Sequence, residues 1–259
     1  MRLGICCDLD LVDAAAKAGF DYFEGRVAVV CVPEQDEAAF SRVLAQVKAA
    51  PIPCEALNGL MRGDIRITGP GADPAALERY AATVIERAAR AQVKMVVFGS
   101  GGVRDVRDGF DRDKALDQIV DFGGVLADLA GRHGLTVALE PLNSRECNMI
   151  NSVAEAVHVM QRINHPAFRV LVDGHHWGRD DLPVGDITDH AALLVHAHVA
   201  TTPNRLAPGL EPCEKMKEFF AALNKIGYNA RVSIEGKMNN PEADLPVALA
   251  AMKTLASAS

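Results

Sequence analysis

Four residues that can bind a metal ion or transfer a proton lie at the ends of short apolar segments in the second half of the chain. Glu140 ends LTVALE, Asp173 ends FRVLVD, His198 lies in VHAHVA, and Glu235 lies in RVSIEG. They are separated by 33, 25 and 37 residues, each close to the length of one strand–helix unit. This spacing predicts that consecutive units deliver the four side chains to the same part of the fold.

A divalent metal ion is the chemistry that this combination favours. Buried carboxylates are costly unless they are paired or bound to a cation, and three that converge raise one another's pKa. Oxygen ligands with one imidazole suit Mn²⁺, Mg²⁺ or Co²⁺ better than a thiolate zinc site does, although Zn²⁺ stays open. In the competing interpretation each acid is a helix N-cap or an exposed loop residue, which explains one such acid better than several at matched positions.

The elements that must position these residues alternate along the chain. Eight apolar, β-prone segments are expected to be strands: 2–7, 20–25, 53–58, 93–99, 135–140, 168–173, 195–200 and 231–236. The amphipathic segments after them are expected to be helices: 11–19, 34–49, 73–91, 111–134, 152–163, 186–194, 214–227 and 241–256. Eight such units predict an α/β fold, a (β/α)8 TIM barrel. No linker is visible, so we expect residues 1–259 to form a single domain.

The barrel explains the placement of the four polar residues, because active sites of this fold lie at the carboxyl ends of the strands. An open doubly wound sheet is the alternative fold. Its usual GxGxxG turn after the first strand is replaced here by CCDLDL. His196 and His198 share one face of their strand, since side chains alternate, and His196 is expected to be a buried structural histidine one layer deeper.

Composition and charge exclude several classes of partner. Lys and Arg number 27 against 34 Asp and Glu, which gives a net charge of −7 and argues against a nucleic-acid partner. The start, MRLGICCDLDLVDAAA, has too short an apolar run for a secretory signal, and no apolar segment is long enough for a membrane span. The six cysteines contain no CxxC pair, so reduced thiols are expected. We therefore expect a cytoplasmic protein without a membrane partner.

The segments ALEPLNSRE, VDGHH, VHAHVATTPNRLAPG and SIEGK resemble the sugar phosphate isomerase/epimerase family of xylose isomerase-like TIM barrels. Ketose 3-epimerases, hydroxypyruvate isomerase and AP endonuclease family 2 share this superfamily. The resemblance covers nearly the whole chain and is strongest from 93 to 236. It implies a metal-dependent isomerase or epimerase of a small ketose or related hydroxy-carbonyl substrate, with one divalent ion, Mn²⁺ first, in a homodimer or homotetramer. Two carboxylates would transfer a proton through a cis-enediolate while the metal polarises the carbonyl.

The resemblance also implies roles for individual residues. The metal ligands would be Glu140, Asp173, His198 and Glu235. The two acid/base groups would be Glu140 and Glu235. The substrate-binding residues would be Glu146, His176 and Arg205. His176 completes the family's Asp-x-x-His pattern, which leaves the adjacent His175 as a bystander, and Arg205 follows the ligand histidine by seven residues rather than the family's six.

Several alternatives stay open. A hydroxypyruvate isomerase would share the two glutamates, and an inosose dehydratase-like lyase would use similar ligands to expel water. An AP endonuclease needs further histidines from earlier strands, and the strand ends ALNGL and VFGSGG contain none. A non-catalytic sugar-binding barrel would have lost a ligand, and no ligand position is lost. Glu24, at the end of the second strand, could contact substrate, position a ligand or serve structure alone. Arg104, in the glycine-rich SGGVRDVRDG, is expected to be an ordinary loop arginine rather than a phosphate contact.

Overall fold

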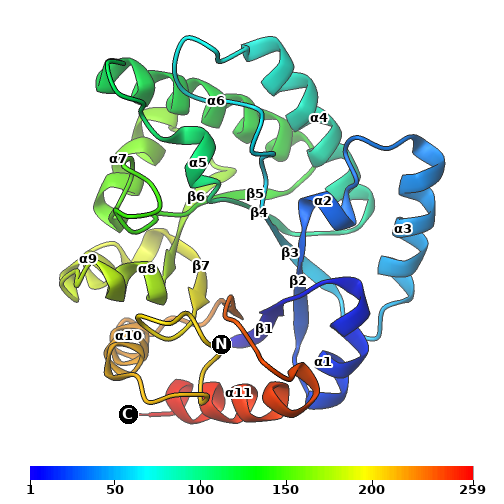
Figure 1. The fold of residues 1–259 in the computed structure, drawn as a ribbon, viewed down its shortest axis with the longest axis vertical. Helices are drawn as coiled ribbons and strands as arrows, with labels where there is room; N and C mark the ends of the chain where they lie inside the picture. Colours follow the sequence, from blue (N-terminus) through cyan, green and yellow to red (C-terminus); the bar gives the residue numbers. More distant parts are fainter. Residues whose placement is uncertain (259) are drawn as a thin grey trace.

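The computed structural model, which describes residues 1–258, contains a closed ring of eight parallel strands surrounded by helices (Figure 1). The strands are β1 (Arg2–Cys6), β2 (Tyr22–Arg26), β3 (Cys54–Asn58), β4 (Met95–Phe98), β5 (Thr136–Leu139), β6 (Phe168–Asp173), β7 (Leu194–Val199) and β8 (Arg231–Ile234). Each strand pairs with the next along the chain, and β8 closes the ring by pairing with β1. The predicted (β/α)8 TIM barrel is confirmed.

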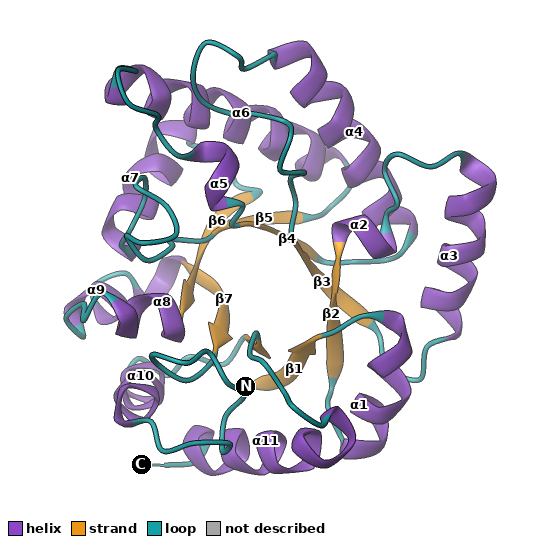
Figure 2. Cartoon of the chain, in the orientation of Figure 1, coloured by secondary structure: helices purple, strands orange, loops and turns teal. Residues whose placement is uncertain are grey.

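Long helices form the outer layer of the barrel, and several of the short helices lie nearer the strands (Figure 2). The outer helices are α1 (Val12–Ala18), α3 (Glu37–Ala49), α4 (Pro74–Arg90), α6 (Arg112–Arg132), α7 (Val153–Ile163), α10 (Glu214–Lys225) and α11 (Pro241–Ala256). The short ones are η1 (Leu9–Leu11), α2 (Val27–Val30), α5 (Gly101–Arg104), α8 (Gly174–Arg179), α9 (Gly185–Thr188) and η2 (Ala191–Leu193). Capping side chains set several of the starts: Asp73 accepts from two backbone N–H groups of α4, and Asp111 from one of α6.

The sixth unit differs from the sequence prediction. The single helix expected over 186–194 is wrong, because α9 and η2 occupy only parts of that range. Instead α8 begins directly after β6, where Asp173 serves as its N-cap. The helix ends shortly before Asp181, whose φ of 51° lies in the left-handed region, and Pro183 follows. The consequence for the site is that the segment carrying both adjacent histidines is helical and buried.

The interior of the barrel is divided into an apolar and a polar part. The apolar part comes from β3 to β6 and contains Ala56, Met95, Val97, Ala138 and Leu171. The polar part comes from β2, β7 and β8 and contains Tyr22, Glu24, His196, His198 and Ser233, all completely buried. Gly4 on β1 makes room for this part, because a Cβ there would lie 2.2 Å from the Tyr22 ring. The polar part of the interior thus lies beneath the carboxyl ends of β7 and β8.

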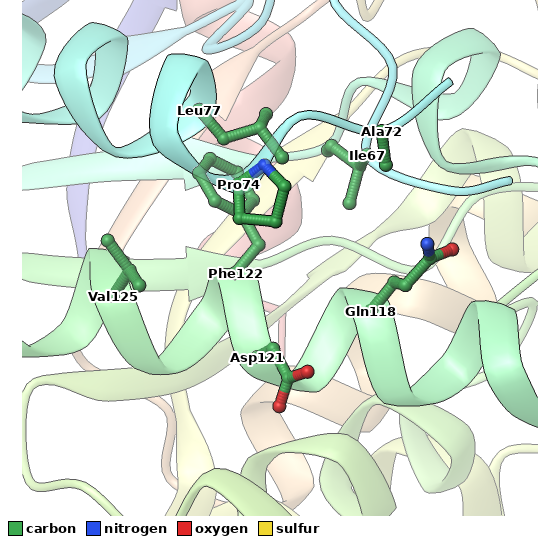
Figure 3. Close-up of a pocket in the computed structure, with 8 residues that line it drawn as sticks. All are labelled: Ile67, Ala72, Pro74, Leu77, Gln118, Asp121, Phe122 and Val125. Carbon is green, nitrogen blue, oxygen red and sulfur yellow. The ribbon is translucent and has the colours of Figure 1, made fainter. Parts of the chain in front are cut away.

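An apolar cavity of about 100 Å³ lies between α4 and α6 of the outer layer (Figure 3). Its lining includes Ile67, Leu77 and Phe122, and Gln118 at its edge is already hydrogen-bonded to the backbone of Gly69. Nothing in this cavity suggests a ligand. Within residues 1–258, no helix is both long and apolar enough to cross a membrane, and all six cysteines are free.

Candidate active site

The residues singled out in the sequence meet at the carboxyl ends of the strands. Glu140 directly follows β5, Asp173 ends β6, His198 lies near the end of β7, and Glu235 directly follows β8. The Nδ1 atom of His198 lies 2.9 Å from Oε1 of Glu140 and 3.8 Å from Oε2 of Glu235. One donor atom each of Glu140, Asp173, His176 and Glu235 also lies within 4.8 Å of the others. Five side chains therefore converge on one point.

Glu140 depends on two residues of the glycine-rich segment after β4. A Cβ at position 99 would lie 2.1 Å from Oε2 of Glu140, so only glycine leaves room for this carboxylate. Arg104 is completely buried and donates to the backbone carbonyls of Phe98 at 2.9 Å and of Glu140 at 2.6 Å. The expectation of an ordinary loop arginine is therefore wrong. Through these two hydrogen bonds Arg104 joins the carboxyl ends of β4 and β5.

Asp173 uses its two carboxylate oxygens differently. Oδ1 accepts a hydrogen bond of 2.7 Å from the backbone N–H of His176 and so caps α8. Oδ2 is buried and has no hydrogen-bond partner within residues 1–258. The choice between a cap and a ligand, posed by the sequence, is therefore not exclusive. One oxygen anchors the short helix, and the other is free for a ligand at the site.

His176 is oriented by Asn143, in the loop after β5. The Asn143 amide donates to Oε1 of Glu146 at 2.9 Å, and its carbonyl oxygen accepts from the backbone N–H of Arg145 at 3.2 Å. These two contacts fix the amide, so Nδ2 must also donate to Nδ1 of His176, at 2.7 Å. The proton of the neutral His176 ring is then on Nε2, which is buried and has no partner in the described chain. His176 therefore presents an N–H group to the site.

His175 points to another part of the loop. Its Nδ1 donates a hydrogen bond of 2.8 Å to the backbone carbonyl of Thr201, in the loop after β7. Its ring is buried and meets that of His176 edge to face, with 5.5 Å between the ring centroids. One of its ring nitrogens lies within 4.8 Å of donor atoms of Glu146 and His176, so it borders the site. Its role as a bystander stays a prediction.

Arg205 spans the mouth of the site. Its guanidinium forms an ion pair with Glu235 and a second one, of 3.3 Å, with Glu146. Its backbone has a φ of 56°, in the left-handed region that disfavours side chains with a Cβ. Two backbone hydrogen bonds hold it there, from its own N–H to Thr201 at 3.0 Å and from the N–H of Lys237 to its carbonyl at 2.7 Å.

The net effect of burial and of the charges around this point is to raise the pKa values of two of its members, Glu235 and His198. Burial, together with the charges of Glu140 and Asp173, raises the pKa of Glu235 to about 7 against the lowering effect of His198. Burial alone would lower the pKa of His198, but the carboxylates of Glu24 and Glu140 raise it well above its ordinary value. The site therefore contains one carboxyl group poised to hold a proton near neutral pH, which is the property of a general acid or base.

The sequence matches a known family over most of its length. The family described as a xylose isomerase-like TIM barrel matches residues 12–255. The chain belongs to this family. A curated relative, D-psicose 3-epimerase of Agrobacterium fabrum (strain C58), is 26% identical over 235 residues, which cover 86% of this chain and 77% of the relative. The comparisons confirm the expected class of enzyme, an isomerase or epimerase.

Two solved structures of similar fold extend this comparison. A crystal structure of D-psicose 3-epimerase in the presence of D-fructose has a TM-score of 0.84 and 20% identity, with 100% of both chains covered. The IOLI protein with a bound zinc atom has a TM-score of 0.80 and 18% identity, covering 99% of this chain and 98% of that one. At these identities the comparison shows only that this protein shares its fold with the two solved structures.

Several residues that support the site were not identified from the sequence. Asn143 lies in the quoted segment ALEPLNSRE, but its role depends on the orientation of its amide, which a sequence does not give. Ser233 could have been found, because it lies two residues before Glu235 and so on the same face of β8. Gly99 was visible as the end of an apolar run, but not the carboxylate that needs its space.

The mouth of the site is an open cavity of about 380 Å³. Its lining consists of Cys6, Arg205, Glu235, Gly236 and Lys237. Three of these residues, Arg205, Glu235 and Lys237, have ionisable side chains, so the lining of the opening is largely polar. A cavity of this size accommodates a small hydrophilic molecule above the converging carboxylates.

Proposed function

We propose that the protein is a metal-dependent epimerase or isomerase of a small ketose or related hydroxy-carbonyl sugar, in which Glu140 and Glu235 transfer the proton. The observation that carries the proposal is the convergence of these two carboxyl groups on one point, beside His198 and the free oxygen of Asp173. The relative named D-psicose 3-epimerase supports a ketose as the substrate class. Hydroxypyruvate isomerisation is the nearest alternative, since it would use the same two carboxylates.

The donor set fits a single divalent cation. Glu140, Asp173, Glu235 and His198 offer carboxylate oxygens and one imidazole nitrogen, a set suited to Mn²⁺ and also to Mg²⁺, Co²⁺ or Zn²⁺. The partnerless Oδ2 of Asp173 is the strongest sign, because a buried carboxylate oxygen without a hydrogen bond is costly unless a cation satisfies it. When bound, the ion would polarise the substrate carbonyl and so acidify the neighbouring carbon.

His176 is better suited to contact the substrate than to bind the ion. A metal ligand needs a free lone pair on the coordinating nitrogen, and the contact from Asn143 places the proton on Nε2 instead. That N–H can donate to a substrate oxygen. Glu146 and Arg205 would contact other hydroxyl groups of the sugar at the mouth.

The two carboxyl groups would act from different sides of the substrate. Glu140 follows β5 and Glu235 follows β8, so they approach the common point from separated positions on the ring of strands. One removes a proton from the carbon beside the carbonyl, and the other returns a proton. Return to the same carbon from the opposite face inverts that centre. Return to the neighbouring carbon instead interconverts a ketose and an aldose.

The experiment combines metal analysis with isotope exchange. The protein is purified, its metal content is measured by mass spectrometry, and a panel of ketoses and hydroxypyruvate is incubated with it in D₂O and followed by NMR. We expect one divalent ion per chain and deuterium at a carbon beside the carbonyl of the true substrate. Glu140→Gln and Glu235→Gln should each lower turnover by at least about 1,000-fold, in keeping with the loss of a general acid or base.

Glu78→Gln provides the matched control, because Glu78 is exposed on α4 and outside the site. It should keep the activity of the parent protein. Full turnover in either site variant would refute the two-carboxylate mechanism. The assignment of residues 1–259 to one domain, the cytoplasmic location and the homodimer or homotetramer stay predictions that accompany this proposal.

A further inference from the structure

Glu24 lies directly beneath the candidate metal site and is completely buried. Its Oε1 is 3.0 Å from Nε2 of His198. Its Oε2 is 2.8 Å from Nε2 of His196 and accepts a hydrogen bond of 2.8 Å from the hydroxyl of Ser233. The proposed reaction assigns no role to Glu24. Burying a carboxylate nevertheless costs free energy that these three contacts must offset.

We propose that Glu24 is a positioning residue that holds His198 in the tautomer whose Nδ1 lone pair faces the metal site. A carboxylate is an acceptor only, so the ring nitrogen that faces Glu24 must carry the proton. That nitrogen is Nε2. Nδ1 faces Glu140 at 2.9 Å in the same way, and its proton is the one that a bound ion would displace, because Glu24 keeps the proton on Nε2. This inference rests on the proposed function, because it presumes that His198 binds the ion.

The orientation of the Glu24 carboxylate is itself fixed by the polar interior. Ser233 gives its proton to Glu24, so the hydroxyl of Tyr22, 2.9 Å away, must donate to Ser233. The Tyr22 ring lies in the space that a side chain at Gly4 would need. Tyr22 of β2 and Ser233 of β8 therefore orient the Glu24 carboxylate, in the space that β1 leaves. That carboxylate contacts His198 of β7.

An alternative role for Glu24 is that of a ligand to a second ion. Donor atoms of Cys6, Glu24 and His198 lie within 4.8 Å of one another. Both oxygens of Glu24 already face protonated groups, however, and an ion there would have to displace three hydrogen bonds. The hydrogen-bonded arrangement therefore favours the positioning role, and the metal stoichiometry distinguishes the two.

The first test is metal affinity in Glu24→Gln. Glutamine has nearly the same shape but offers one acceptor and one donor group, so it cannot accept from both histidines. We expect the dissociation constant for Mn²⁺, measured by calorimetry or chelator competition, to rise about 10- to 100-fold, the usual effect of removing such a partner of a ligand histidine. The stoichiometry should stay at one ion per chain.

Tyr228→Phe is the matched control. It removes a hydrogen bond of 2.7 Å from the hydroxyl of a buried tyrosine to the backbone carbonyl of Arg231 and leaves every contact of Glu24 in place. Its Mn²⁺ affinity should stay within about threefold of the parent value, although it loses one hydrogen bond like the glutamine variant. Equal losses of affinity in the two variants would assign Glu24 to general stability and overturn the inference.

A measurement on the unmodified protein makes the test independent of variant folding. In the Zn²⁺-loaded protein, ¹⁵N NMR of the histidine rings should show His198 with a protonated Nε2 and a coordinated Nδ1. Coordination through Nε2 would overturn the inference, as would wild-type affinity in Glu24→Gln. If the unmodified protein binds no divalent ion at all, the proposed function fails as well, so the two failures are distinguishable.

Discussion

The side-chain amide of Asn143 fixes the ring of His176, with 2.7 Å between Nδ2 of the asparagine and Nδ1 of the histidine. The same Nδ2 donates to Glu146, so one amide group joins two of the proposed substrate-binding residues. Asn143 was not singled out in the sequence. Its contacts explain how one histidine of the adjacent pair is prepared to donate a hydrogen bond.

Asn143→Ala should therefore impair substrate binding and leave metal binding intact. The ring of His176 would lose the contact that fixes its tautomer, at a cost of about 1–3 kcal/mol for the partner left unsatisfied. We expect kcat/KM to fall about 10- to 100-fold and the metal dissociation constant to change by less than about threefold. Ser144→Ala, which removes a contact of 3.1 Å to Asp180, is the control. Unchanged kcat/KM in Asn143→Ala would show that His176 needs no such support.

Gly99→Ala should displace Glu140. The new methyl group would lie 2.1 Å from Oε2 of this carboxylate, far inside van der Waals contact. We expect loss of bound metal and a fall in activity of at least about tenfold with the barrel still folded, as monitored by circular dichroism and metal analysis. Gly102→Ala, where the added methyl group meets nothing within 4 Å, should retain both metal and activity.

Arg104→Met should lower the stability of the protein. The buried carbonyl of Glu140 would lose its donor, at about 1–3 kcal/mol, and that of Phe98 would keep only the backbone N–H of Glu140. We expect the free energy of unfolding, from urea titration, to fall by at least about 2 kcal/mol. Arg107→Met, at an exposed position three residues on, should change it by less than about 0.5 kcal/mol. Equal stabilities would contradict the structural role assigned to Arg104.

Cys7 should resist alkylation although it is only half-buried. Burial, with the charges of Asp8 and Asp10, raises the pKa of its thiol to about 12. The thiolate is the reactive form, so iodoacetamide at pH 8 should modify Cys7 more than about 100-fold more slowly in the folded protein than in urea. The rate should rise about tenfold per pH unit above pH 8. Peptide mass spectrometry measures both, and rapid labelling of the folded protein at pH 8 would contradict the expectation.

Patterns repeated along the chain allowed the barrel to be predicted. Apolar runs and amphipathic runs alternate eight times, and the strand segments predicted from them overlap all eight observed strands. The exception is the unit after β6, where α8 begins directly after the strand because Asp173 caps it, and only α9 and η2 overlap the helix expected over 186–194. A local signal for this was present, since aspartate is a favoured cap, but it was assigned to metal binding alone.

Only the residues that face the metal and substrate could be predicted from the sequence. Acids and histidines at strand ends indicate metal binding or proton transfer by their residue type alone. The residues that support them act through orientation and packing, which the sequence does not show. Arg104 illustrates the difference: its sequence context is a glycine-rich loop, yet a short helix turns its side chain into the fold. Glu24 was noticed, but the choice among its possible roles required the distances to His196 and His198.

The left-handed backbone of Arg205 has a consequence for the catalytic cycle. For a residue with a Cβ this conformation costs on the order of 1–2 kcal/mol, and two hydrogen bonds impose it, one within its own loop to Thr201 and one from Lys237 in the loop after β8. The main chain thus fixes where the Arg205 side chain starts, and two ion pairs, with Glu146 and Glu235, hold its guanidinium. When Glu235 takes up a proton during turnover, the pair with Glu146 remains, and we expect the arginine to stay at the mouth while the charge of the site changes.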